Sequence, residues 1–214
     1  MSFVALLDAE DLVHANTGLS LPRRGLLNFF YEAEEQMAWG FDPEHADGWK
    51  VILADPSIAQ ERGRPDGALG FTECSLRCRE VLTLPDPAEP VLHDMSQRHA
   101  DPLYELFEKW ERIAGIEAPH HQVGGWPSLV QNPLQTECQL ASNGLYCGNG
   151  GAYVDPRHEE VRRGAAEWRL LLQLDSDEAP GWMWGDCGSL YYCIRGDAAD
   201  AAALEAAWMI FQCC

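Results

Sequence analysis

Two apolar runs near the end of the chain, joined by an acidic loop that is rich in tryptophan, constrain the fold most strongly. They lie within residues 167–195, EWRLLLQLDSDEAPGWMWGDCGSLYYCIR. In the second run, from Leu190 to Ile194, apolar side chains alternate onto both sides of an extended chain. Because neither side is polar, the run predicts an interior strand that is covered on both faces.

Three segments of the N-terminal part recur near the C-terminus in the same order. They are an apolar run that ends in an acidic turn (3–10 and 170–177), a glycine that opens an aromatic run (25–31 and 188–194), and a tryptophan that opens an apolar run (49–53 and 208–212). We interpret this as a three-strand unit used twice, with both halves packed as one domain over residues 1–214. Chance similarity between apolar strands is the alternative.

Composition narrows the classes of partner. The 214 residues include 15 basic and 34 acidic side chains, a formal charge of −19. Binding to nucleic acid or to an anionic membrane needs clustered Lys and Arg, so neither partner is predicted. The chain has no apolar run long enough to span a bilayer and no signal-peptide pattern, which predicts a cytoplasmic protein. The oligomeric state is left open.

Helices are signalled at three places. The surest begins at Asp101 and Pro102, carries an apolar face from Leu103 to Ile113 and ends before Gly115. Others are expected at 155–164 and 198–207. Residues 55–90 read as loop-rich around one or two strands, and the glycine-rich stretches beyond Pro119 read as ordered loops.

Residues 121–147, HQVGGWPSLVQNPLQTECQLASNGLYC, together with 167–195, resemble the YwqG-like family of bacterial proteins, which has no established biochemical activity. The resemblance implies an α+β domain dominated by antiparallel strands and built by duplication. It also implies an interaction role, because some relatives sit beside toxin and immunity genes. Family members usually carry an upstream Pro/Gly/Trp-rich segment, and we expect that segment to be absent here.

The acidic loop offers the clearest candidate for a metal. Asp175, Asp177 and Asp186 fall where positions 1, 3 and 12 of an EF-hand loop would lie. Pro180 occupies the position of the required glycine, and the flanks look like strands. Carboxylates that cap a tight turn are therefore the favoured interpretation, and no metal or other cofactor is predicted.

Candidate residues for binding a ligand or partner are polar or aromatic side chains within the two family segments or directly beside them. They are His120, His121, Trp126, Gln131, Glu137, Gln139, Trp184 and Asp186. A histidine that met Glu137 or Asp186 would form a general acid/base pair. No catalytic residue is predicted, because the usual nucleophile, phosphate-loop and zinc-protease motifs are absent.

The loop tryptophans have two interpretations. Trp39, Trp126, Trp182 and Trp184 lie in glycine-containing loops, where exposed rings would anchor a partner. Packing at the ends of the core is favoured over that role. Together these features predict a non-catalytic cytoplasmic binding protein, an immunity-type or other interaction module that meets a basic partner. The alternative is a small-ligand or metal-binding protein, including an enzyme, with its site near His120, His121, Glu137, Asp175, Asp177 and Asp186.

Overall fold

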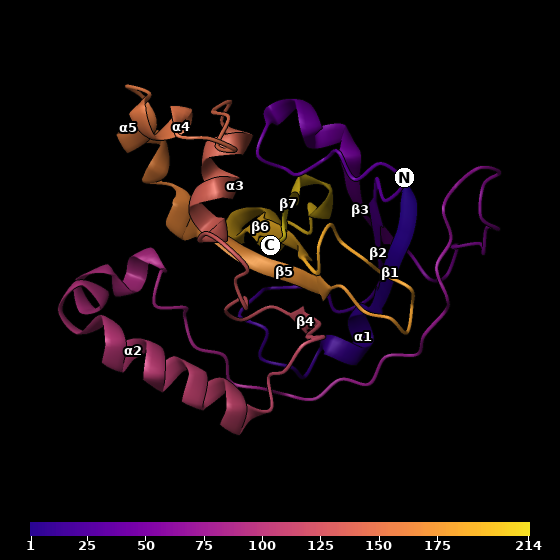
Figure 1. Cartoon of the computed structure of the whole chain (residues 1–214). Helices are drawn as coiled ribbons and strands as arrows, with labels where there is room; N and C mark the ends of the chain where they lie inside the picture. Colours follow the sequence, from indigo (N-terminus) through magenta and orange to yellow (C-terminus); the bar gives the residue numbers. More distant parts are fainter.

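The computed structural model describes residues 1–214 and contains two antiparallel sheets with helices around them (Figure 1). The strands are β1 (Ser2–Asp8), β2 (Leu26–Tyr31), β3 (Trp49–Ala54), β4 (Gln122–Val123), β5 (Trp168–Asp175), β6 (Ser189–Arg195) and β7 (Trp208–Gln212). The α-helices are α1 (Ala9–Leu12), α2 (His93–Ala114), α3 (Leu134–Ser142), α4 (Gly151–Val154), α5 (His158–Arg162) and α6 (Gly196–Asp200). Short 3-10 helices are η1 (Pro43–Gly48), η2 (Pro90–Leu92), η3 (Ala165–Glu167) and η4 (Leu204–Ala206).

Each sheet is a meander in which consecutive strands pair. The first has the order β1-β2-β3 and the second β4-β5-β6-β7, all antiparallel. The prediction of an α+β fold dominated by antiparallel strands is confirmed. The strands predicted from the recurring segments are β1 to β3 and β5 to β7. Their origin by duplication stays a prediction.

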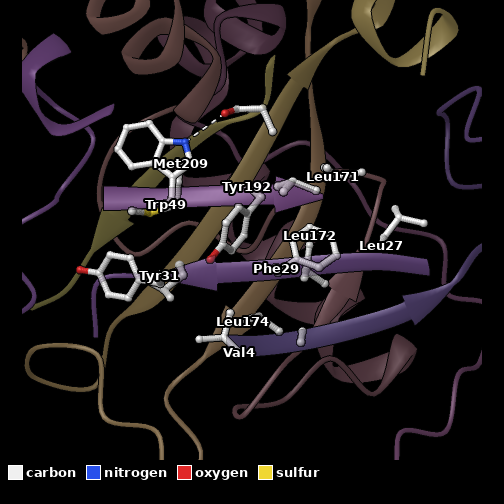
Figure 2. Close-up of a cluster of buried hydrophobic side chains, with 14 of the residues drawn as sticks. Val4, Leu27, Phe29, Tyr31, Trp49, Leu171, Leu172, Leu174, Tyr192 and Met209 are labelled. Carbon is white, nitrogen blue, oxygen red and sulfur yellow. Dashed lines mark hydrogen bonds between the residues drawn. The ribbon is translucent and has the colours of Figure 1, made fainter. Parts of the chain in front are cut away.

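The two sheets share their main hydrophobic core. One cluster of 26 buried residues joins β1–β3 to the facing sides of β5, β6 and β7. Phe29 of β2 and Tyr192 of β6 meet at its centre, with ring centroids 5.1 Å apart (Figure 2). A second cluster lies on the opposite side of β5–β7, under α3, and includes Tyr191 and Cys193 of β6. Strand β6 is therefore covered on both faces, as the sequence predicted.

Two tryptophans make hydrogen bonds between the halves. Trp49, at the start of β3, donates its indole N–H to the carbonyl of Ala207 at 3.0 Å. Trp208, at the start of β7, donates its indole N–H to the carbonyl of Gly40 at 2.8 Å. Their rings pack edge to face with centroids 5.0 Å apart. These contacts tie the starts of β3 and β7 together across the core.

The surest predicted helix is present but starts earlier. Helix α2 runs from His93, is kinked at His99, and ends where Gly115 adopts a left-handed conformation. None of its residues is buried, and it lies to one side of the two sheets (Figure 1). No helix of the structure has both the length and the apolar character needed to cross a membrane.

The other helix predictions are confirmed only in part. Helix α5 falls within the predicted range 155–164. The helix expected over 198–207 is wrong in extent: it divides into α6 and η4, with Ala202 at a φ of 54° between them. No strand forms between β3 and η2, so the strands expected there are also wrong. Helix α3 was not predicted.

Gly40 lies in a bend directly before Phe41, where the chain passes close to the backbone of β7. Its φ is 78°, and an added Cβ would lie 1.8 Å from the carbonyl oxygen of Met209. Gly40→Ala is expected to lower the free energy of unfolding by about 2 kcal/mol, because it adds left-handed strain and a backbone clash. Gly181 has a φ of 82° and open space around it, so Gly181→Ala should show the strain alone. Equal losses in urea unfolding of the two variants would contradict the close approach at Gly40.

Candidate functional site

A cavity of about 490 Å³ lies beside α3, between the segment after β2 and the loop that follows α3. Its walls mix amides, one carboxyl, one thiol and two aromatic rings: Phe41, Gln131, Asn132, Pro133, Thr136, Glu137, Cys147, Gly148, Asn149 and Tyr153. Gln131, Asn132 and Asn149 are exposed, so this side opens to solvent. The volume falls within the roughly 300–1,000 Å³ of small-molecule sites.

Packing of α3 sets the position of Glu137. Leu134 and Cys138, one helical turn apart, pack against β5, β6 and β7. Leu140 and Ala141 pack against the loop that follows the helix. Glu137 lies between these buried positions and is one of the residues that line the cavity.

The Glu137 carboxyl is held by two neutral amides. Glu137 is buried, with 1% of its surface exposed. One oxygen accepts a hydrogen bond from Asn132 Nδ2 at 3.1 Å, and the other accepts from Gln212 Nε2 at 3.0 Å. Gln212 is itself fixed, because it also donates to the carbonyl of Asn132 at 2.8 Å and accepts from the amide N–H of Gln131 at 3.0 Å.

Burial dominates the protonation of Glu137. It raises the pKa of this carboxyl to about 7, and the hydrogen bonds from Gln212 and Asn132 offset only part of that effect. None of the six ion pairs in the structure includes Glu137. The cavity therefore contains a carboxyl that changes charge near neutral pH and has no cationic neighbour in contact.

Two other acidic groups share this environment. Burial, reinforced by Glu137, raises the pKa of the Cys147 thiol to about 12. Burial also raises the pKa of Tyr153 to about 12, with further contributions from Glu137 and Cys147. A thiol with so high a pKa stays protonated at neutral pH and is a weak nucleophile. Glu137 is the group in the cavity suited to exchange a proton near pH 7.

The predicted histidines lie elsewhere, at the end of β5. His121 Nε2 is 3.1 Å from Asp177 Oδ2, and His121 Nδ1 accepts from the Asp175 amide at 3.2 Å. His120 Nε2 is 2.7 Å from Gln122 Oε1, and its amide donates to Asp175 Oδ2 at 2.7 Å. Both nitrogens of His121 are thus engaged. The structure brings these histidines to Asp175 and Asp177 of the β5 turn, and neither forms a hydrogen bond with Glu137 or Asp186.

Asp175 and Asp177 accept hydrogen bonds at the end of β5 and in the turn that follows it. Asp175 Oδ1 accepts from Ser189 Oγ at 2.8 Å and from Gln173 Nε2 at 3.0 Å. Asp177 accepts from the Ala179 amide at 2.9 Å, and this bond is the main cause that lowers its pKa. Asp186 is exposed. The structure contains no group of three or more His, Cys, Asp or Glu side chains arranged to hold a metal ion.

Three other candidates, Gln139, Trp184 and Trp126, do not line the cavity. Gln139 is buried between Trp168 Nε1, which donates to it at 2.8 Å, and the carbonyl of Val161, to which it donates at 2.9 Å. Trp184 is 1% exposed and lies in the main core. Trp126 is half-buried, and its amide donates to Thr83 Oγ1 at 2.8 Å. Of the predicted residues, only Gln131 and Glu137 line the cavity.

Sequence reasoning missed most of the cavity walls. Phe41, Asn132, Cys147 and Tyr153 were not candidates, since they come from separate loops whose meeting depends on the packing of α3. A usable signal was present. Leu134, Cys138 and Ala141 follow a helical spacing after Pro133 and before Asn143-Gly144, which would have predicted α3.

The family model described as a domain of unknown function, DUF1963, matches residues 1–213. The chain belongs to this family. A search of curated proteins with this chain found no match. The whole of the cavity and the histidine cluster lie within the matched range.

Proposed function

We propose that this DUF1963 protein binds a small polar molecule in the cavity beside α3. The observation that carries the proposal is the buried Glu137 carboxyl, held by Asn132 and Gln212 at the wall of a cavity of about 490 Å³. A buried ionisable group without a charged partner costs folding free energy, and such groups concentrate at binding and catalytic sites. The proposal follows the small-ligand alternative and moves its centre from the histidines to Glu137.

Four compounds with the same length of carbon chain test it: butylammonium, butanol, butyramide and butyrate. Saturation-transfer NMR at millimolar concentration is expected to detect binding of at least one. Thr136 lines the cavity, so Thr136→Phe should abolish that signal by filling the space. Ser142 is exposed on the same helix, and Ser142→Phe is the matched control. No binding by any compound, or binding that survives Thr136→Phe, would overturn the proposal.

A second function rests on the formal charge of −19. We propose that the acidic surface binds a basic protein, as expected for an immunity-type interaction module of the YwqG-like kind in the cytoplasm of a bacterium. Long-range attraction of this type weakens with salt. Capture from the native host should recover a protein of high isoelectric point at low salt and release it at high salt, and co-expression should rescue cells from it if it is toxic. Salt-insensitive capture of neutral proteins only would count against it.

A further inference from the structure

We propose that the molecule taken by the Glu137 cavity is a small organic cation, an alkylammonium or alkylguanidinium group whose nitrogen pairs with the Glu137 carboxylate. This inference rests on the proposed function and specifies its ligand class.

The polar partners of Glu137 leave a charge uncompensated. Asn132 and Gln212 donate to its two oxygens, and both donors are neutral amides. A carboxylate has about four lone-pair sites, so these two bonds leave acceptor capacity for an ammonium or guanidinium donor. Charge-assisted bonds of that kind are about twice as strong as bonds between neutral groups.

The walls of the cavity suit a cation better than an anion. Gln131, Thr136 and Asn149 offer neutral oxygens that accept hydrogen bonds from N–H donors. Phe41 and Tyr153 add aromatic rings, which attract cations through their faces. No Lys, Arg or His lines the cavity, so an anion entering it would lose its hydration without gaining a positive partner.

The thiols and the phenol around Glu137 are uncharged at pH 7 and compensate none of its charge. Cys138 lies on the same helix as Glu137. Cys147, in the loop after α3, and Tyr153, in α4, are also electrostatic neighbours of Glu137. Asp42 acts on Cys147 from the segment after β2. The one basic group nearby is His158, whose ring packs against Tyr153 with centroids 5.5 Å apart and pairs with Glu159. The chain's charge of −19 would raise the local concentration of cations further.

Binding of a cation should release a proton. Before a cation binds, burial holds the pKa of the Glu137 carboxyl at about 7, so this carboxyl is mostly protonated at pH 6.5. A cation binds the ionised form and displaces the proton to solvent, which at pH 6.5 amounts to about three-quarters of a proton per cation bound. Butanol and butyramide should release none.

Isothermal titration of wild-type protein with the four-carbon series provides the test. Butylammonium is expected to bind at least tenfold more tightly than butanol. Its heat of binding at pH 6.5 should differ between phosphate and the zwitterionic buffer ACES, which offers no free cation to compete, by the number of protons released times the difference between the ionisation enthalpies of the two buffers. Tyr153→Leu should weaken butylammonium about threefold while leaving butanol unchanged. Glu137→Gln should remove both the preference and the proton release.

The outcomes separate the two proposals. Binding of butanol, butyramide or butyrate equal to that of butylammonium, or cation binding without proton release, would overturn the cation inference and leave the small-ligand function standing. Absence of binding by all four compounds would overturn both. Because the wild-type series decides these outcomes, they do not depend on whether Glu137→Gln folds.

Discussion

Replacing Phe29 by alanine is expected to lower the free energy of unfolding by about 3–5 kcal/mol. Phe29 is fully buried, and its ring packs edge to face on Tyr192 between the two sheets. Truncation would remove this contact between β2 and β6 and leave a void in the shared core. Urea unfolding followed by tryptophan fluorescence is the appropriate measurement, since most indoles lie in the C-terminal half: Trp110, Trp126, Trp168, Trp182, Trp184 and Trp208.

Phe3 is a matched control on the opposite face of the same sheet. It is 49% exposed, and its ring packs on Phe30 with centroids 5.7 Å apart. Phe3→Ala should therefore cost only about 1 kcal/mol. A fluorescence transition unmoved by Phe29→Ala would show that the C-terminal half unfolds without the first sheet. That result would contradict both the shared core and the prediction of one domain over residues 1–214.

The strands were predictable because their signal is local. Apolar runs such as Leu190 to Ile194 carry both the strand preference and the two-sided burial in consecutive residues. Helix α3 was harder, since Glu137 and Gln139 interrupt its apolar pattern and become buried only through partners on other elements, such as Gln212 and Trp168. Tertiary contacts there override the polarity of the sequence.

The candidate site shows the same limit. Gln131 and Glu137 were candidates because they stand in a polar family segment, but nothing local joins them to Phe41 or Tyr153. The partners of the histidines also depend on tertiary contacts. His120 and His121 look reactive in sequence, yet the pairing of β4 with β5 brings them to Asp175 and Asp177, where hydrogen bonds engage both of the His121 ring nitrogens.

Stability is expected to fall as the pH rises from about 5 to about 7. Burial raises the pKa of Glu137 from 4.5 to about 7 in the folded state, and burial followed by the charge of Asp86 does the same for Glu89. Below pH 4.5 each carboxyl is protonated in both states, so it adds no pH dependence. Between pH 4.5 and 7 only the unfolded chain loses the proton, which draws the equilibrium toward unfolding. Above pH 7 both states are ionised and the loss is complete.

Each of these two carboxyls should account for about 3 kcal/mol of that loss, given 1.36 kcal/mol for each unit of pKa difference. Both residues are 1% exposed, so solvent screening is small. Urea unfolding at pH 5, 6, 7 and 8 measures the change. Glu137→Gln and Glu89→Gln should each remove about half of the slope, and the double variant should remove most of it.

Glu34→Gln provides the control, because it neutralises an exposed carboxyl in the turn after β2. Glu89 and Glu137 also differ in their hydrogen bonds, so the two Gln variants test different effects. Neither of its carboxyl oxygens has a hydrogen-bond partner, whereas Glu137 accepts from two amides, so Glu89→Gln tests desolvation alone and Glu137→Gln also disturbs Asn132 and Gln212. A slope that persists in the double variant would mean that neither carboxyl is protonated in the folded protein at pH 6. Proton release on cation binding at Glu137 would then lose its source, so the same unfolding series also tests the chemistry assigned to the cavity.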